Sequence, residues 1–101
     1  MIIVYVVCKD KEEAKKIGKK LVDERLVACA NFFPLNSIYW WKDKIVEDEE
    51  VALLLKSKKE NFEKIKEEVI NLHSYEVPCI IQLDVAKADE EYLKWLKGEV
   101  E

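Results

Sequence analysis

The segment Ile2-Ile3-Val4-Tyr5-Val6-Val7-Cys8 carries the strongest structural signal in the chain. It is β-branched and aromatic, it is short, and Lys9-Asp10 ends it, so it predicts a β-strand buried on both faces. A second apolar run, Val51-Ala52-Leu53-Leu54-Leu55, closes an expected strand over 45–56. Because strands without polar alternation occupy the interior of a sheet, we expect these two strands to be its central pair.

Helical patterns flank both strands. Asp10 with Glu13 resembles a capping box, and apolar residues then recur at helical spacing, which predicts a helix over about 10–24. Ser57 with Glu60 forms a second such pair and predicts a helix over about 58–72. Asp89 is expected to cap a short C-terminal helix.

The remaining segments are expected to be extended. From 26 to 41 no helical period holds, and the residues around Pro34 predict a long, bulged strand. Lys42-Asp43-Lys44 predicts a tight turn into the strand 45–56, and a last strand is expected over 79–85. Within Tyr39-Trp40-Trp41, alternation places one indole in the core and the other outside.

This order of elements predicts one domain over residues 1–101. A β-α-β-β-α-β chain followed by a short helix is the ferredoxin-like α+β sandwich. A chain of 101 residues has enough surface to bury for a single compact domain of this kind.

The apolar residues on both faces of the expected central strands predict a homo-oligomer. In a two-layer domain one face of the sheet meets solvent and normally carries polar side chains. Leaving four large apolar side chains in water forgoes roughly 6–10 kcal/mol, which is comparable to the net stability of a domain. Another copy of the chain is expected to cover this face; the alternative is a loop or the terminal helix.

Composition excludes several classes of function. With 17 basic against 21 acidic residues, the net charge of −4 is opposite to that of a duplex-binding protein, so we expect no nucleic-acid partner. The longest apolar run has seven residues against the roughly 20 that a membrane span needs, so we expect neither a span nor an export signal. Three cysteines without a CxxC pair favour a reducing cytoplasm.

The residues able to carry chemistry are few. Only two glycines, Gly18 and Gly98, are present, which excludes Gly-rich phosphate loops and nucleophile elbows, and an enzyme with His73 as base is the least favoured function. The thiols Cys8 and Cys29 with the imidazole of His73 form a soft donor set, which prefers copper, especially Cu(I), to calcium or magnesium. Buried packing of the thiols and helix capping by His73 are the alternatives.

Three further positions have both a structural and a functional interpretation. Cys29 lies between two alanines and precedes Asn31, which leaves space for a ligand. Lys56 ends an apolar run, either as a lysine reaching to solvent or as a ligand-binding cation. Glu47 begins a run of four acids that is either a solvated edge or a weak site for divalent ions.

Several blocks in order along the chain resemble the CutA divalent-cation tolerance proteins. They are 25–31 (RLVACAN), 39–42 (YWWK) with Lys44 and the acids 47–50, Lys56, 73–78 (HSYEVP) and 92–96 (YLKWL). The resemblance implies a ferredoxin-like subunit in a homotrimer, a cytoplasmic location and a role in tolerance of copper or another divalent cation. The family usually has Pro where this chain has Ser74.

The resemblance also implies a pocket between subunits. It assigns Cys29, Lys56, His73 and the aromatic residues of the hairpin to that pocket. From the soft donor set we expect His73, Cys29 and Cys8 as metal ligands, and we expect no organic cofactor. The cleft is expected to include the residues Lys56, Asn31, Trp41, Glu47 and Tyr75. An alternative function, based on fold analogy, is a trimeric sensor that binds an anionic metabolite between subunits through Lys56.

Overall fold

The computed structural model describes all residues 1–101 and has the predicted order of elements. The α+β fold is confirmed, with three α-helices and a four-stranded sheet. The elements are β1 (Ile2–Cys8), α1 (Lys11–Asp23), β2 (Cys29–Trp41), β3 (Lys44–Ser57), the 3₁₀ turn η1 (Lys59–Asn61), α2 (Phe62–Leu72), β4 (Ile80–Asp84) and α3 (Glu90–Glu99). None of the helices combines the length and apolar character that crossing a bilayer requires.

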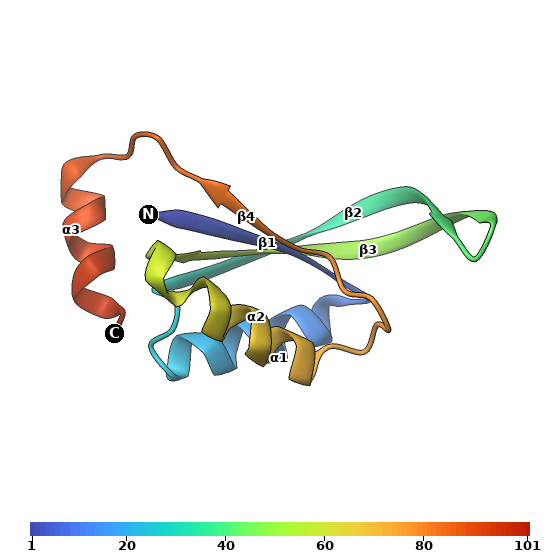
Figure 1. The fold of residues 1–101 in the computed structure, drawn as a ribbon, viewed down its shortest axis with the longest axis horizontal. Helices are drawn as coiled ribbons and strands as arrows, with labels where there is room; N and C mark the ends of the chain where they lie inside the picture. The colour runs from blue at the N-terminus through green and yellow to red at the C-terminus, as the bar shows by residue number, and fades with distance from the viewer.

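The sheet is antiparallel with strand order β2-β3-β1-β4, so the two apolar strands are central as predicted. Helices α1 and α2 lie side by side against one face of the sheet (Figure 1). Alternate residues of β1, from Ile2 to Cys8, point to this helix-covered face and are fully buried. The opposite face, called the open face below, carries Ile3, Tyr5 and Val7 of the same strand.

The hydrophobic core fills the layer between the sheet and the two helices. Both helices contribute the apolar stripes that the sequence predicted. These are Ala14, Ile17 and Leu21 from α1, and Ile65 and Val69 from α2. These side chains pack on alternate residues of β1 and β3, as the period of two in a strand requires. The core therefore fixes the end of β1, at Cys8, against the start of α1, near Ala14.

Strand β2 is regular, so the predicted bulge is wrong. Its residues pair one to one with β3 from Cys29 opposite Lys56 to Trp41 opposite Lys44. Pro34 is tolerated because β2 is an edge strand, where a residue without an N–H need not break the ladder. The tight turn is confirmed: Lys42 and Asp43 both have left-handed φ angles, 48° and 65°, as a two-residue hairpin turn needs.

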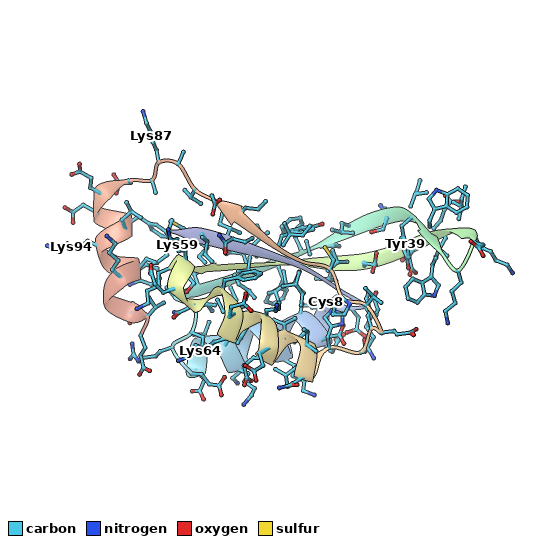
Figure 2. All side chains as sticks on the ribbon, viewed as in Figure 1. Cys8, Tyr39, Lys59, Lys64, Lys87 and Lys94 are labelled. Atoms are coloured by element: carbon cyan, nitrogen blue, oxygen red, sulfur yellow. The ribbon has the colours of Figure 1, made fainter.

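The β2–β3 hairpin extends well beyond the helices, and this overturns the prediction of a core indole. Trp40 is 71% exposed and Trp41 37% exposed, because no helix lies over this part of the sheet (Figure 1). Figure 2 shows Tyr39 far out on this hairpin, whereas Cys8 lies within the body of the molecule. The projecting hairpin gives the molecule its longest dimension, 45 Å.

The predicted capping box at Ser57 is also absent. The Ser57 hydroxyl donates to the carbonyl of Leu26 at 2.6 Å instead of capping the helix. The Asn61 side-chain amide donates to the carbonyls of Leu26 and Glu101, at 3.2 and 3.1 Å. These bonds tie the α1–β2 loop and the C-terminus to the start of α2, so a 3₁₀ turn replaces the first turn of the expected helix.

Helix α3 stands at one end of the sheet and leaves most of the open face uncovered (Figure 1). Asp89 caps it as predicted, and Arg25 anchors its last turn through an ion pair with Glu99 at 3.1 Å. Phe33, Ile81 and Leu83 remain 46–47% exposed. Neither the terminal helix nor a loop therefore covers these apolar side chains.

The two glycines allow a matched test of how closely α1 packs on the sheet. A Cβ added at Gly18 would lie 3.0 Å from the Cβ of Ala30, whereas one at Gly98 meets nothing within 4 Å. We expect Gly98→Ala to stabilise the fold by about 0.5–1 kcal/mol through helix propensity. Gly18→Ala should instead destabilise it by about 1–2 kcal/mol, because overcrowding exceeds that gain. Urea unfolding measures both, and equal effects would contradict the packing described.

Candidate functional site

One cluster of possible metal ligands lies under the helix-covered face of the sheet. Cys8 is the last residue of β1, Glu13 is in the first turn of α1, and His73 follows the last residue of α2. One ligand atom from each of the three lies within 4.8 Å of the others. Cys8 and the His73 side chain are fully buried, and Glu13 is 7% exposed. The packing of both helices against β1 therefore brings His73 to Cys8 and Glu13, which lie 60 or more residues earlier in the chain.

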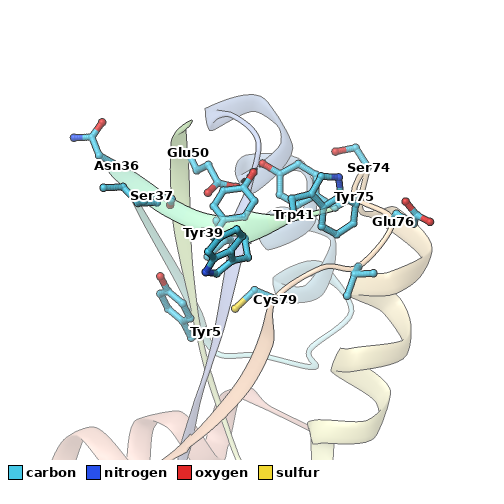
Figure 3. A pocket seen from close by; sticks show the side chains of 14 residues that line it. Tyr5, Asn36, Ser37, Tyr39, Trp41, Glu50, Ser74, Tyr75, Glu76 and Cys79 are labelled. Carbon is cyan, nitrogen blue, oxygen red and sulfur yellow. Dashed lines mark hydrogen bonds between the residues drawn. The ribbon is translucent and has the colours of Figure 1, made fainter. Parts of the chain in front are cut away.

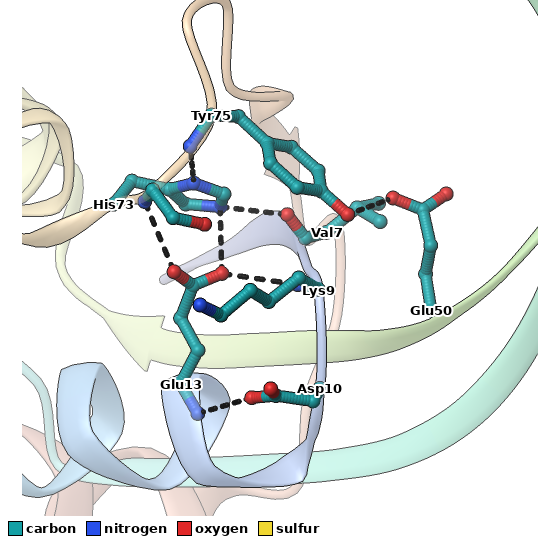
Figure 4. Close-up of polar contacts among 8 residues, drawn as sticks. Val7, Lys9, Asp10, Glu13, Glu50, His73 and Tyr75 are labelled. Atoms are coloured by element: carbon teal, nitrogen blue, oxygen red, sulfur yellow. Dashed lines mark hydrogen bonds and ion pairs between the residues drawn. The ribbon is translucent and has the colours of Figure 1, made fainter.

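Glu13 joins helix α1 to the loop after α2 (Figure 4). One oxygen, Oε1, accepts the Lys9 N–H and the other, Oε2, accepts the Ser74 N–H, both at 3.0 Å. Asp10 accepts the Glu13 N–H at 2.9 Å, which is the helix cap that the sequence predicted. A proline at position 74 would have no N–H to donate, so this contact requires a residue other than proline, here Ser74.

The ring of His73 is held by hydrogen bonds at both nitrogens. Nε2 lies 2.7 Å from the Val7 carbonyl oxygen, and Nδ1 accepts the Tyr75 N–H at 3.0 Å. Because a carbonyl only accepts, and because Nδ1 accepts the Tyr75 N–H, these contacts place the ring proton on Nε2. Nε2 also faces the Glu13 carboxylate, with Oε1 at 3.8 Å. His73 thus fastens the loop after α2 to the end of β1.

The protein opposes ionisation of the Cys8 thiol. Burial, followed by the charges of Glu13, Asp10 and Glu50, raises the pKa of Cys8 to about 12. The thiol is therefore protonated at neutral pH and is a poor nucleophile. A metal cation would reverse this balance, since its charge displaces the thiol proton.

The donor set fits a soft or borderline cation. Thiolate sulfur and imidazole nitrogen are the ligands that copper and zinc prefer, and a carboxylate can complete a small coordination shell. A cation here would compete with hydrogen bonds that Glu13 and His73 already make to backbone groups. Binding must therefore rearrange the loop around His73, and it cannot be a simple insertion.

Cys29, which the sequence grouped with His73, is remote from this cluster within one chain. It pairs with Lys56, which in turn pairs with Ile3, and both lie on the open face. Cys8 is five residues beyond Ile3, about 17 Å along β1, and it lies on the other face. The Cys29 thiol donates to Asn31 Oδ1 at 3.5 Å. Cys29 and His73 can share a site only if a second copy of the chain brings them together.

Lys56 lies close to Cys29 on the open face and has no acidic partner. Its Nζ lies 5.6 Å from the centroid of the Tyr92 ring. None of the ion pairs of the structure involves this lysine. The arrangement leaves a cation next to small and polar side chains at this end of the sheet.

A hollow of about 890 Å³ lies on the open face, between the hairpin and the loop 74–79. Its wall, drawn in Figure 3, is mainly hydrophobic and includes the aromatic residues Tyr5, Tyr39, Trp40, Trp41 and Tyr75. Trp41 and Tyr75 of the predicted cleft set meet here. Glu47 does not line this hollow; it is exposed further out on the hairpin, opposite Ile38.

Glu50 is a buried acid at the edge of this hollow. It is 7% exposed and accepts the Tyr75 hydroxyl at 2.6 Å. Burial and this hydrogen bond raise the pKa of Tyr75 far above its ordinary value. The solvated-edge interpretation of the acidic run is therefore wrong for its last member.

Sequence reasoning missed Glu13 and Glu50 as site residues. Glu13 carried a signal as the partner in a capping box, but that signal does not tell which distant loop the second carboxylate oxygen meets. Glu50 differs from its acidic neighbours only by adjoining the apolar run of β3, and nothing in the sequence names Tyr75 as its partner. Both contacts depend on the path of the loop 73–79.

The role of Glu13 predicts how stability depends on pH. Burial alone would raise the pKa of Glu13, but the hydrogen bonds from Ser74 and Lys9, with the nearby His73, lower it overall. A carboxyl group whose pKa is lowered in the folded state stabilises the fold at pH values above its ordinary pKa of about 4.3. This stabilisation is lost as the pH falls below that value. We expect Glu13→Gln to cost about 1–3 kcal/mol at pH 7 and much less at pH 3, measured by urea unfolding. A cost independent of pH would contradict this.

Known proteins match the chain over nearly its full length. Residues 2–99 match the family model of the CutA1 divalent ion tolerance protein. "Divalent-cation tolerance protein CutA" of Pyrococcus horikoshii is 48% identical over 99 residues, covering 98% of this chain and 97% of the relative.

Solved structures agree with the sequence match. The structure of the "Periplasmic divalent cation tolerance protein CutA" from Archaeoglobus fulgidus superposes with a TM-score of 0.97 at 36% identity, covering both chains completely. A "PII-like protein CutA" from Nostoc sp. PCC 7120, in apo form, has a TM-score of 0.92 at 33% identity, covering 100% of this chain and 98% of that one. The chain belongs to the CutA1 divalent ion tolerance protein family.

Proposed function

We propose that this protein is a homotrimeric copper-binding protein that acts in tolerance of divalent cations by binding and not by catalysis. The observation that carries the proposal is the cluster of Cys8, Glu13 and His73, whose ligand atoms lie within 4.8 Å of one another. Family membership supports a role in cation tolerance. The soft sulfur and nitrogen donors favour copper, and Cu(I) above all, over hard cations.

The three predicted ligands then divide between two places. Cys8 and His73 hold the metal, with Glu13 as a third donor from the same chain. Cys29 belongs with Lys56 and Asn31 to the cleft that we propose forms between subunits on the open face. Its thiol therefore joins the metal site only if a neighbouring subunit places it there.

A titration with Cu(I) under anaerobic, reducing conditions tests the metal site. We expect one Cu(I) per chain for the wild type and for Cys29→Ala. Cys8→Ala should weaken binding by more than about 100-fold, because it removes the soft donor from the site. Cys29→Ala is the matched control for loss of a thiol elsewhere. Wild-type stoichiometry and affinity in Cys8→Ala would reject the site.

The open face supports the trimer. Phe33, Ile81 and Leu83 on this face are almost half exposed, and the hairpin carries two further exposed indoles beyond the helices. Covering such side chains yields about 25 cal/mol for each Å² removed from water. A closed ring of copies covers the same face in every subunit without leaving a free interface.

The cysteines support a reducing location. All three thiols, of Cys8, Cys29 and Cys79, are free. Free thiols and a Cu(I) site both need a reducing compartment to persist. We therefore propose a cytoplasmic location for this chain.

A second candidate function is a trimeric sensor of an anionic metabolite. Lys56 favours it, because this lysine lies on the open face without an acidic partner and is flanked by Cys29 and Tyr92. The likeness to a structure described as PII-like gives further support. A panel of anionic metabolites that raises the melting temperature of the wild type, but not of Lys56→Gln, would favour this function. Metals should be inert in that case.

A further inference from the structure

We propose that metal capture by His73 is coupled to the aromatic hollow on the open face through Tyr75 and Glu50. This inference rests on the proposed metal site and adds a consequence of filling it. The coupling follows from the hydrogen bonds that the His73 ring and Tyr75 make to their neighbours. As a result, metal binding on the helix-covered side of the sheet changes the structure of the open face.

The first step is the proton on His73. In the structure Nε2 carries the proton toward Val7, and Nδ1 uses its lone pair to accept the Tyr75 N–H. A neutral imidazole has one N–H and one lone pair. The nitrogen that binds a metal must offer its lone pair, so it cannot also hold the proton.

Either mode of metal binding therefore breaks the bond between His73 and Tyr75. Nε2 faces the cluster, at 3.8 Å from Glu13 Oε1. If Nε2 binds the metal, its proton moves to Nδ1, which then turns an N–H toward the Tyr75 N–H, and the two donors repel each other. If Nδ1 binds the metal, the metal displaces the Tyr75 N–H directly. In both cases Nδ1 no longer accepts this hydrogen bond.

The second step passes along Tyr75. Its ring lies against that of His73, with centroids 4.8 Å apart, and its hydroxyl donates to Glu50 at 2.6 Å. Figure 4 shows these residues in sequence, from Glu13 through His73 and Tyr75 to Glu50. This series of contacts leads from the helix-covered side of the sheet to the open face.

The last two residues of this series, Tyr75 and Glu50, are part of the wall of the hollow. Tyr75, Glu50 and Ser74 all line it, together with Trp41 (Figure 3). Release of the Tyr75 backbone frees the loop 74–79 and loosens the contact with Glu50. Metal binding thus changes the shape of the hollow, which lies on the face where we place the contact between subunits.

Linkage makes the coupling reciprocal, and this provides the test. Tyr75→Phe removes the bond to Glu50 that holds Tyr75 in the metal-free arrangement, so less is lost when the metal binds. We expect this variant to bind Cu(I) about fivefold or more tightly than the wild type. Tyr92→Phe is the matched control, because the Tyr92 hydroxyl makes no hydrogen bond within the chain, and its affinity should be unchanged.

Amide hydrogen exchange by NMR gives a second readout in the wild-type protein. Adding Cu(I) should speed exchange of the Tyr75 N–H by about tenfold or more, because its acceptor is lost. The Tyr92 N–H, which donates to Asp89 at 3.1 Å, should not respond. Cu(I) binding that depends on Cys8, with an unchanged Tyr75 amide and unchanged affinity in Tyr75→Phe, overturns the coupling alone. Absence of Cu(I) binding overturns both the coupling and the proposed metal site.

Discussion

Ile81→Glu is expected to convert the proposed trimer into monomers of 11.9 kDa. Ile81 lies on β4 opposite Tyr5, points to the open face and is 47% exposed. If another copy covers this face, a glutamate here must lose its water on assembly, and an unpaired buried carboxylate costs several kcal/mol. Analytical ultracentrifugation at micromolar concentration should detect the change directly.

Ile70→Glu is the matched control for this experiment. Ile70 is 51% exposed, but it lies on α2, on the other side of the molecule from the open face. The same change of side chain should leave the mass at that of the wild type, which we propose to be about three chains. Equal masses for wild type, Ile81→Glu and Ile70→Glu would show that the open face is not the interface.

His73→Ala is expected to lose both stability and copper binding. Removing the ring leaves the Val7 carbonyl and the Tyr75 N–H without partners, and it opens a cavity at a fully buried position. Two unsatisfied polar groups and the cavity together predict a loss of about 3–5 kcal/mol in the free energy of unfolding. Affinity for Cu(I) should fall by more than about 100-fold.

Urea unfolding and Cu(I) titration separate these two effects. His73→Gln retains a donor and an acceptor on its side chain, so it should recover part of the stability while binding Cu(I) poorly. Copper binding by His73→Ala at the wild-type level would remove His73 from the metal site. A variant as stable as the wild type would show that His73 does not fasten the loop to β1.

Much of the fold was predictable because it depends on local patterns. The unbroken apolar runs of β1 and β3 indicated central strands, and the helical stripes of α1 and α2 indicated the face that packs on them. The errors arose where tertiary context overrides the local pattern. Pro34 suggested a bulge, but the edge position of β2 accommodates it. An indole of the pair Trp40 and Trp41 was expected in the core, but the hairpin extends past both helices.

The site was predictable only in its residue types. Cys8 and His73 stood out as soft donors, and the structure places them together with Glu13. Alternation along the strands shows that Cys8 and Cys29 lie on different faces of the sheet, but only when the register of β2 against β3 is known. The sequence alone does not give this register. The path of the loop 73–79, which brings His73 to Glu13 and Tyr75 to Glu50, depends on contacts that no local pattern encodes.

X-ray absorption at the copper edge of the Cu(I)-loaded protein tests the central claim most directly, since it identifies the atoms bound to the metal. For the wild type and Cys29→Ala we predict a shell that contains one sulfur and at least one imidazole nitrogen. For Cys8→Ala the sulfur should disappear. A sulfur that persists in Cys8→Ala and vanishes in Cys29→Ala would contradict the assignment and move the metal to the open face.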